Sequence, residues 1–130
     1  MPTTTAMTNS CESALINYVL NGTANPHGRV THIGILSAAG SDSGQTEMSG
    51  SGNRQPIAFD SSSGGSAVTN TGAITFTNSS WGSTSVYGVG FYTGITGGTC
   101  LLYGNFDSVV TVAAGQSLQF NIGGITISMD

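Results

Sequence analysis

Few side chains in this 130-residue sequence could carry acid–base or metal chemistry. The sequence has no lysine and only two histidines, His27 and His32, with Asp42 and Glu47 further downstream. Imidazole and carboxylate groups can together bind a metal ion. The four residues lack the close ligand pairs of a zinc site, however, and His27 stands between a proline and a glycine, as in a turn. We therefore expect no metal site and interpret His32 as a half-buried strand residue.

Carboxylates offer another route to catalysis. Glycoside cleavage needs two of them on either side of a cleft. Asp60 and Asp107 are the acids that adjoin strongly predicted strands, but each stands where a turn is expected, and turn capping explains both more simply. The lack of lysine also excludes P-loop and Schiff-base sites, and no G-x-S-x-G motif is present. The sequence thus predicts a protein that is not an enzyme and that has no catalytic residue and no cofactor.

The charge balance argues against two classes of partner. Arg29 and Arg54 are the only basic residues apart from the histidines, and they face six acids, for a net charge of −4. Nucleic-acid binding needs several basic side chains to neutralise phosphates. No apolar run approaches the roughly 20 residues of a spanning helix, and the first residues do not resemble a signal peptide. We expect neither nucleic acid nor membrane as a partner, and synthesis in a cytoplasm.

The two cysteines, Cys11 and Cys100, lie on very different segments. A small disulfide-stabilised scaffold usually has more cysteines at closer spacing. The pattern favours free, buried thiols that act as small apolar residues. A disulfide between the two remains the alternative.

One helix is predicted, over residues 10–20. Asn9 is a suitable N-cap, Glu12 can complete a capping box, and Gly22 is a suitable C-terminal stop. Apolar residues at i, i+4, i+7 and i+8 form one face of this helix. They are Cys11, Leu15, Tyr18 and Val19.

The rest of the chain has the pattern of short strands separated by turns. β-branched runs and alternating apolar residues predict eight strands. These strands span residues 30–36, 55–59, 73–77, 85–92, 99–106, 109–112, 117–120 and 125–129, and the pair 109–120 is predicted to form a hairpin. Such a series is typical of a mainly β fold, an antiparallel β-sandwich or jelly-roll-like domain with one short N-terminal helix.

The domain is expected to span residues 9–130, preceded by an extended N-terminal arm at residues 1–8. The arm consists of a proline and a threonine run, and it could add main-chain hydrogen bonds to a partner by strand addition. The glycine- and serine-rich loops 38–53 and 60–65 are expected to be ordered by a neighbouring subunit.

Trp81 is the single tryptophan, and it stands at a junction between a loop and a strand. It could serve as a stacking platform or an interface anchor. It could equally close one end of the sandwich, which is the commoner role for a tryptophan in such a position. The sequence favours the second role and leaves the first open.

The order of these segments resembles a known class of protein. Residues 73–76, Trp81 with the glycine after it, and residues 86–92, 97–104, 110–120 and 125–128 follow one another as in the small β-sandwich virion structural proteins of tailed bacteriophages. That class includes capsid decoration (cement) proteins and tail fibre proteins. The similarity covers residues 9–130 in layout.

The resemblance implies a structural component of the virion, made in the host bacterial cytoplasm. We expect a capsid cement protein that binds the major capsid protein and copies of itself, as a homotrimer on the outer shell. The candidate interface residues are Pro2, Thr3, Thr4, Thr5 and Trp81. The alternative is a tail fibre or baseplate module that recognises a host surface glycan through Trp81 or a tyrosine.

Overall fold

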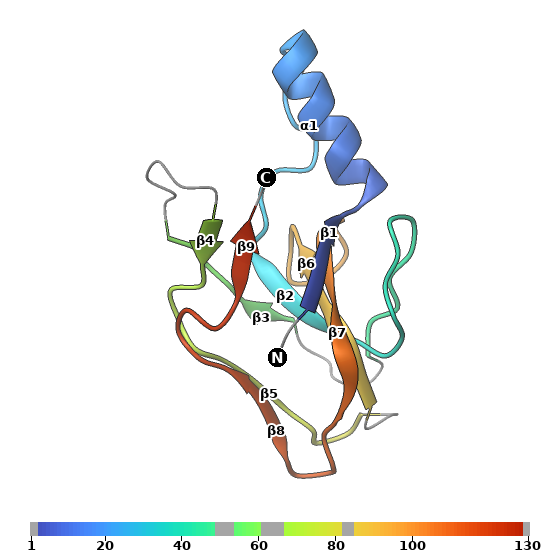
Figure 1. Cartoon of the computed structure of the whole chain (residues 1–130), viewed down its shortest axis with the longest axis vertical. Coiled ribbons are helices and arrows are strands. Elements are labelled where there is room, and N and C mark those ends of the chain that lie inside the picture. Colours follow the sequence, from blue (N-terminus) through green and yellow to red (C-terminus); the bar gives the residue numbers. More distant parts are fainter. Residues whose placement is uncertain (1–2, 49–53, 61–66, 82–84, 129–130) are drawn as a thin grey trace.

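The computed structural model describes residues 3–48, 54–60, 67–81 and 85–128, with residues 3–5 described by their backbone alone. It confirms a mainly β fold with antiparallel sheets and one helix. The largest sheet has five strands, all paired antiparallel, and Figure 1 shows them beneath the helix. In spatial order the strands are β1 (Thr3–Met7), β7 (Cys100–Thr111), β6 (Ser85–Tyr92), β2 (His32–Leu36) and β3 (Gln55–Pro56).

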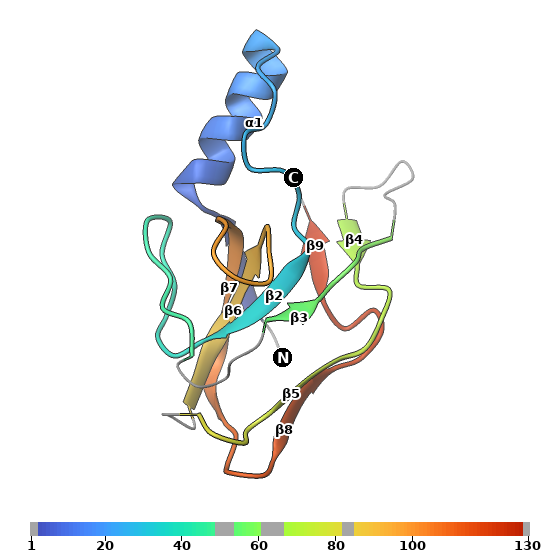
Figure 2. The same cartoon turned by 180° about the vertical axis from the view of Figure 1, so that it is seen from behind.

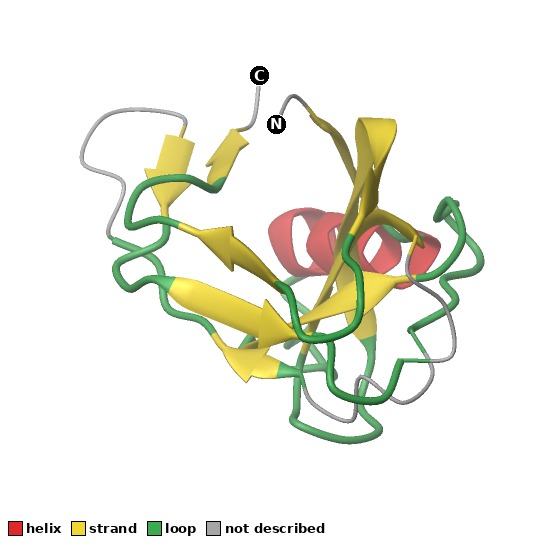
Figure 3. Ribbon diagram, turned by 90° about the horizontal axis from the view of Figure 1, so that it is seen from below, coloured by secondary structure: helices red, strands yellow, loops and turns green. Residues whose placement is uncertain are grey.

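Two short antiparallel ladders complete the fold. In one, β5 (Ile74–Thr77) pairs with β8 (Ser117–Phe120), and in the other, β4 (Ala67–Thr69) pairs with β9 (Thr126–Ser128). Seen from below, the two ladders lie on one side of the molecule and the long strands of the main sheet lie on the other (Figure 3). This arrangement is compatible with the predicted sandwich.

The core lies between the main sheet and the ladders. Ile74 and Phe76 of β5 are buried whereas Thr75 and Thr77 are exposed, which confirms the alternation in the sequence. The strand β6 also has the predicted bounds. Both faces of the second half of β6 are buried, because it lies in the middle of the sheet. The buried cluster includes Ile33, Ile35, Ile74, Phe76, Val86, Val89, Phe91, Leu118 and Phe120.

The predicted hairpin over residues 109–120 is wrong. Residues 109–111 continue β7, and Val110 pairs with Val86 of β6. The strand β8 crosses to the opposite layer, where Leu118 pairs with Phe76 of β5. Because the chain changes layer after residue 112, the apolar sides of β7 and β8 can both face the core from opposite layers. In a simple hairpin the two strands would lie side by side in one sheet.

The N-terminal segment also differs from the expected arm. Residues 3–7 form β1, the edge strand of the main sheet, with Thr3 opposite Phe106 and Met7 opposite Leu102. Strand addition therefore takes place onto β7 of the same chain. Threonines suit a strand, and β1 covers an edge that β7 would otherwise expose.

The helix α1 (Asn9–Asn21) follows β1 directly. Its N-cap is Thr8, one residue before the predicted cap, and the hydroxyl of Thr8 accepts a hydrogen bond from the Cys11 N–H at 3.3 Å. Thr8 is favoured over Asn9 because its hydroxyl also donates to the carbonyl of Cys100 at 2.8 Å, which joins the cap to the sheet. Gly22 ends the helix at a φ of 71°, as predicted.

No residue of α1 is buried. Figures 1 and 2 show that the helix projects beyond the end of the sheet and that only its first turn meets the strands. Five large apolar side chains of α1 are exposed: Leu15, Ile16, Tyr18, Val19 and Leu20. None of the described helices is long and apolar enough to cross a bilayer.

The described part of the loop that follows β2 folds back onto its own chain. The Ser37 N–H donates to the carbonyl of Thr46, and the Met48 N–H donates to the carbonyl of Ile35. These bonds tie both ends of the segment 37–48 to this chain's own backbone, and ordering by a neighbouring subunit stays a prediction. Residues 49–53 and 61–65 of the two predicted loops lie outside the described residues.

Candidate functional site

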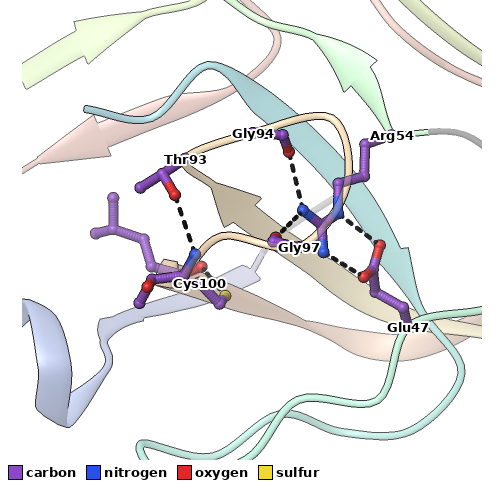
Figure 4. A network of polar contacts seen from close by, with 8 residues as sticks. Glu47, Arg54, Thr93, Gly94, Gly97 and Cys100 are labelled. Carbon is purple, nitrogen blue, oxygen red and sulfur yellow. Dashed lines mark hydrogen bonds and ion pairs between the residues drawn. The ribbon is translucent and has the colours of Figure 1, made fainter. Parts of the chain in front are cut away.

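The end of the sheet next to α1 carries a network of charged and aromatic side chains around Arg54, which precedes β3. The guanidinium of Arg54 donates two hydrogen bonds to the carboxylate of Glu47, at 3.0 Å from Nε and 2.7 Å from Nη2 (Figure 4). It lies 3.7 Å from the centre of the Tyr92 ring, within range of a cation–π interaction. The side chain of Arg54 is 10% exposed. The geometry is the two-pronged contact that arginine makes with carboxylates and that lysine cannot reproduce.

The same guanidinium holds the turn that joins β6 to β7. Its Nη1 donates to the carbonyls of Gly94 and Gly97, at 2.9 and 2.6 Å (Figure 4). We call residues 93–99 the apical loop. Its two ends are joined by hydrogen bonds between Thr93 and Thr99, including one of 3.0 Å from the Thr99 N–H to the Thr93 hydroxyl. Residues 95–98 are exposed, so a rigid base carries an accessible tip.

Two glycines make room for this network. Gly34 of β2 and Gly90 of β6 are paired across the sheet. A Cβ atom at Gly90 would lie 2.8 Å from the Tyr92 ring, and one at Gly34 would lie 2.8 Å from Oε2 of Glu47. The bare backbone of the pair is thus the surface on which the Tyr92 ring and the stem of Arg54 lie.

Burial and charge set the titration of these groups. Burial raises the pKa of the Tyr92 phenol well above its ordinary value. Burial likewise raises the pKa of the Cys100 thiol, and it is the main cause of the raised pKa of Cys11. Both cysteines are free and half-buried, as the sequence favoured. Neither thiol is an activated nucleophile, because reactive cysteines have lowered pKa values.

The residues considered as metal ligands make hydrogen bonds to other side chains. The Nδ1 atom of His32 lies 2.8 Å from the hydroxyl of Thr31, and Nδ1 of His27 lies 3.4 Å from that of Thr99. Asp42 accepts a 2.6 Å hydrogen bond from the Tyr103 hydroxyl. Across the described part of the chain, no three histidine, cysteine or acidic side chains are grouped as metal ligands would be.

The two carboxylates weighed for catalysis have different surroundings. Asp60 accepts a 2.7 Å hydrogen bond from the Thr69 N–H, nine residues further on, so it joins the two ends of its loop and does not form the local turn cap that was predicted. Asp107 does not lie in a turn. It is an exposed residue within β7, which continues from Cys100 to Thr111 because β1 and β6 pair with it on either side.

The candidate interface residues are divided between the two layers. Pro2 lies outside the described residues, and Thr3, Thr4 and Thr5 belong to β1 in the main sheet. Trp81 follows β5 in the opposite layer, where it is half-buried and contacts the core. That position matches a residue that closes one end of the sandwich.

Sequence reasoning missed the Arg54 network and two buried asparagines. The amide of Asn78 donates to the carbonyl of Val112 at 2.7 Å, and Asn70 accepts a 2.8 Å hydrogen bond from the Ile125 N–H. The sequence did not single out Arg54 for such a network, because Arg29 stands in the same position before the predicted strand 30–36 and is exposed.

Comparison with known proteins gives one family. The family model described as Gp80, podophage GP4 fiber I protein gp80, matches residues 6–128 of the chain. The match begins within β1 and ends with β9, so it spans nearly all of the described fold. No curated protein matches the sequence.

Proposed function

This chain belongs to the podophage GP4 fiber I protein gp80 family, and on that premise we propose that it is a fibre module that binds a glycan on the host surface. It is a structural component of a bacteriophage virion. The family match supports the fibre alternative and gives no support to our first expectation, a cement protein on the major capsid protein.

The observation that carries the glycan proposal is the braced apical loop. Its exposed tip, residues 95–98, has no ionic group and offers hydroxyl, backbone and small apolar surface. Sugars are recognised by such groups when the groups are already held in position, because a fixed loop loses little entropy on binding. The bonds from Arg54 to Gly94 and Gly97 supply that fixation. Binding of this kind involves no covalent chemistry.

Binding to a glycan array tests the proposal. We expect the purified protein to bind a defined set of glycans, and the double variant Ile95→Ser/Thr96→Ala to lose at least about tenfold in affinity, or 1.4 kcal/mol. The matched control is Ile122→Ser, because Ile122 is 69% exposed and Ile95 is 59% exposed. Equal losses in both variants, or no glycan bound by the unaltered protein, would refute the proposal.

Labelling of intact particles separates the fibre from the capsid. An antibody against the chain should decorate the tail region in electron micrographs, with copy numbers of tens or fewer per particle. Label spread over the capsid surface would restore the cement hypothesis.

A further inference from the structure

The segment that returns from α1 to the sheet encloses a groove along one side of the helix. Figures 1 and 2 show this segment, residues 22–31, running back beside the helix before it enters β2. Two pockets lie between the helix and the segment, with volumes of about 470 and 350 Å³. They share Ala14 and Ala24, and we call them together the helix groove. Both volumes are in the range of sites that hold small ligands.

The two pockets of the helix groove differ in polarity. The larger one is lined mainly by hydroxyl, amide and imidazole side chains, those of Ser10, Ser13, Asn17, Thr23 and His27 among them. The smaller one is mainly apolar, and its lining includes Leu15, Tyr18 and Leu101. Positions 10, 13 and 17 form one row along the helix, and positions 11, 15 and 18 form the next row. The groove therefore offers polar groups on one side and an aromatic, apolar surface on the other.

The walls of the polar pocket are held in place by this chain. The Thr23 N–H donates to the carbonyl of Asn17 at 3.2 Å, which joins the returning segment to the helix. The side-chain oxygen of Asn17 accepts a 3.2 Å hydrogen bond from the amide of Asn21. Nδ1 of His27 lies 3.4 Å from the hydroxyl of Thr99, at the base of the apical loop. The pocket thus borders the apical loop, and a ligand there would spend little binding free energy on ordering the protein.

The charges around the helix groove favour an uncharged ligand. The described residues that line it include no lysine, arginine, aspartate or glutamate. Glu12 is two positions from Ala14 and so lies on the other side of the helix. A phosphate, carboxylate or ammonium group would lose hydration in the groove without gaining an ion pair. Hydroxyl and amide side chains can instead bond to the hydroxyls of a sugar, and an aromatic ring can pack against its C–H face.

We propose that the helix groove binds an uncharged oligosaccharide. One sugar unit is hydrogen-bonded by Ser10, Ser13 and Asn17, and the next unit packs on Tyr18, which is 60% exposed. The site rests on the proposed function and makes it specific, because it assigns a neutral glycan and places it between α1 and the apical loop. A purely apolar ligand fits less well, since it would cover the hydroxyls of the polar pocket without bonding to them.

A glycan array with two kinds of probe tests the site. The neutral probes are hexasaccharides of glucose, mannose, galactose and N-acetylglucosamine, and the acidic probes are oligogalacturonate and polysialic acid. We expect binding to a neutral probe and none to the acidic ones. The variant Ser10→Ala/Ser13→Ala should weaken that binding at least about tenfold, because two hydrogen bonds are lost. Alanine is a better helix former than serine, so the variant retains α1.

The matched control is Ile16→Ala/Val19→Ala, which alters exposed residues of the same helix that line neither pocket and should leave the affinity unchanged. Ala14→Leu is a second groove variant. Its larger side chain would fill the point that the two pockets share, and leucine is also a good helix former, so binding should be abolished in a folded protein. Unchanged unfolding midpoints of the variants verify that they fold.

The outcomes separate this inference from the proposed function. Equal binding of a neutral glycan by the unaltered protein and by both groove variants would overturn the groove as its site. Binding of acidic glycans alone would overturn it as well, and in both cases the chain remains a glycan-binding protein. Binding to none of the probes, neutral or acidic, would overturn the inference and the proposed function together.

Discussion

At the scale of single residues, the arrangement around Arg54 depends on two neighbouring strand positions that have no side chain. The guanidinium needs Glu47 and two carbonyls on its edge and the Tyr92 ring on its face, and the ring in turn needs a backbone without side chains beneath it. Gly34 and Gly90 provide that backbone. Four separate segments thus converge on one arginine.

Replacement of Gly90 tests this arrangement. We expect Gly90→Ala to lower the free energy of unfolding by about 1–3 kcal/mol, because the added methyl group would meet the Tyr92 ring and force it from Arg54. Urea denaturation measures the loss. The control is Gly72→Ala, since a Cβ atom there meets nothing within 4 Å. Equal stabilities of the two variants would mean that the ring moves aside freely.

At the scale of elements, β1 has two roles. It covers the edge of β7 and leads directly into the cap of α1, where the Thr8 N–H donates to the carbonyl of Leu101 at 3.0 Å. The position of the helix is therefore tied to the edge of the sheet. The sequence predicted an extended arm at residues 1–8, whereas residues 3–7 form a strand of the main sheet.

Deletion of residues 1–7 should destabilise the domain. A ladder of five residue pairs is lost, and with backbone hydrogen bonds worth about 0.5–1.5 kcal/mol each we expect the free energy of unfolding to fall by about 2–5 kcal/mol. Thermal and urea unfolding measure the change, and deletion of residues 1–2 alone serves as the control. An unchanged unfolding midpoint after the longer deletion would show that the segment is a detachable arm after all.

At the scale of the whole molecule, folding depends on neutral groups. The hydrophobic core and the backbone ladders hold the layers together, and Arg54–Glu47 is the one ion pair between side chains in the described residues. Besides Arg54, whose pKa is raised mainly by its hydrogen bond with Glu47, the groups with a displaced pKa are phenols and thiols, which lose their protons in alkali.

We expect stability to fall as the pH rises past about 10, the ordinary pKa of tyrosine. Burial raises the pKa of Tyr92 in the folded protein, so above pH 10 the unfolded chain loses this proton while the folded chain retains it. The loss approaches about 1.4 kcal/mol per pH unit for one such group.

Denaturant unfolding between pH 8 and pH 11 measures this loss. Tyr92→Phe keeps the ring against Arg54 and removes the proton, so its stability should fall less steeply with pH. The control is Tyr87→Phe, because Tyr87 is an exposed tyrosine of the same strand. Identical slopes for the two variants would show that Tyr92 does not govern the alkaline transition.

Local patterns determined much of this protein in advance. The mainly β fold, the helix with its stop at Gly22, the bounds of β6 and the buried side of β5 all follow from signals that lie within a few residues of one another. Side-chain periodicity and capping act over one turn or one strand, so they can be recognised without a partner.

The tertiary structure alone decided which strands pair and which polar groups meet. Nothing local indicated that β8 pairs with β5, that β1 joins the sheet, or that Arg54 reaches Glu47 and the apical loop. These contacts join residues far apart in sequence and depend on which arrangement buries the most apolar surface with every hydrogen bond satisfied. The apolar face of α1 shows the same division: its residue spacing is local, but the direction in which it points is set by the chain packed behind it.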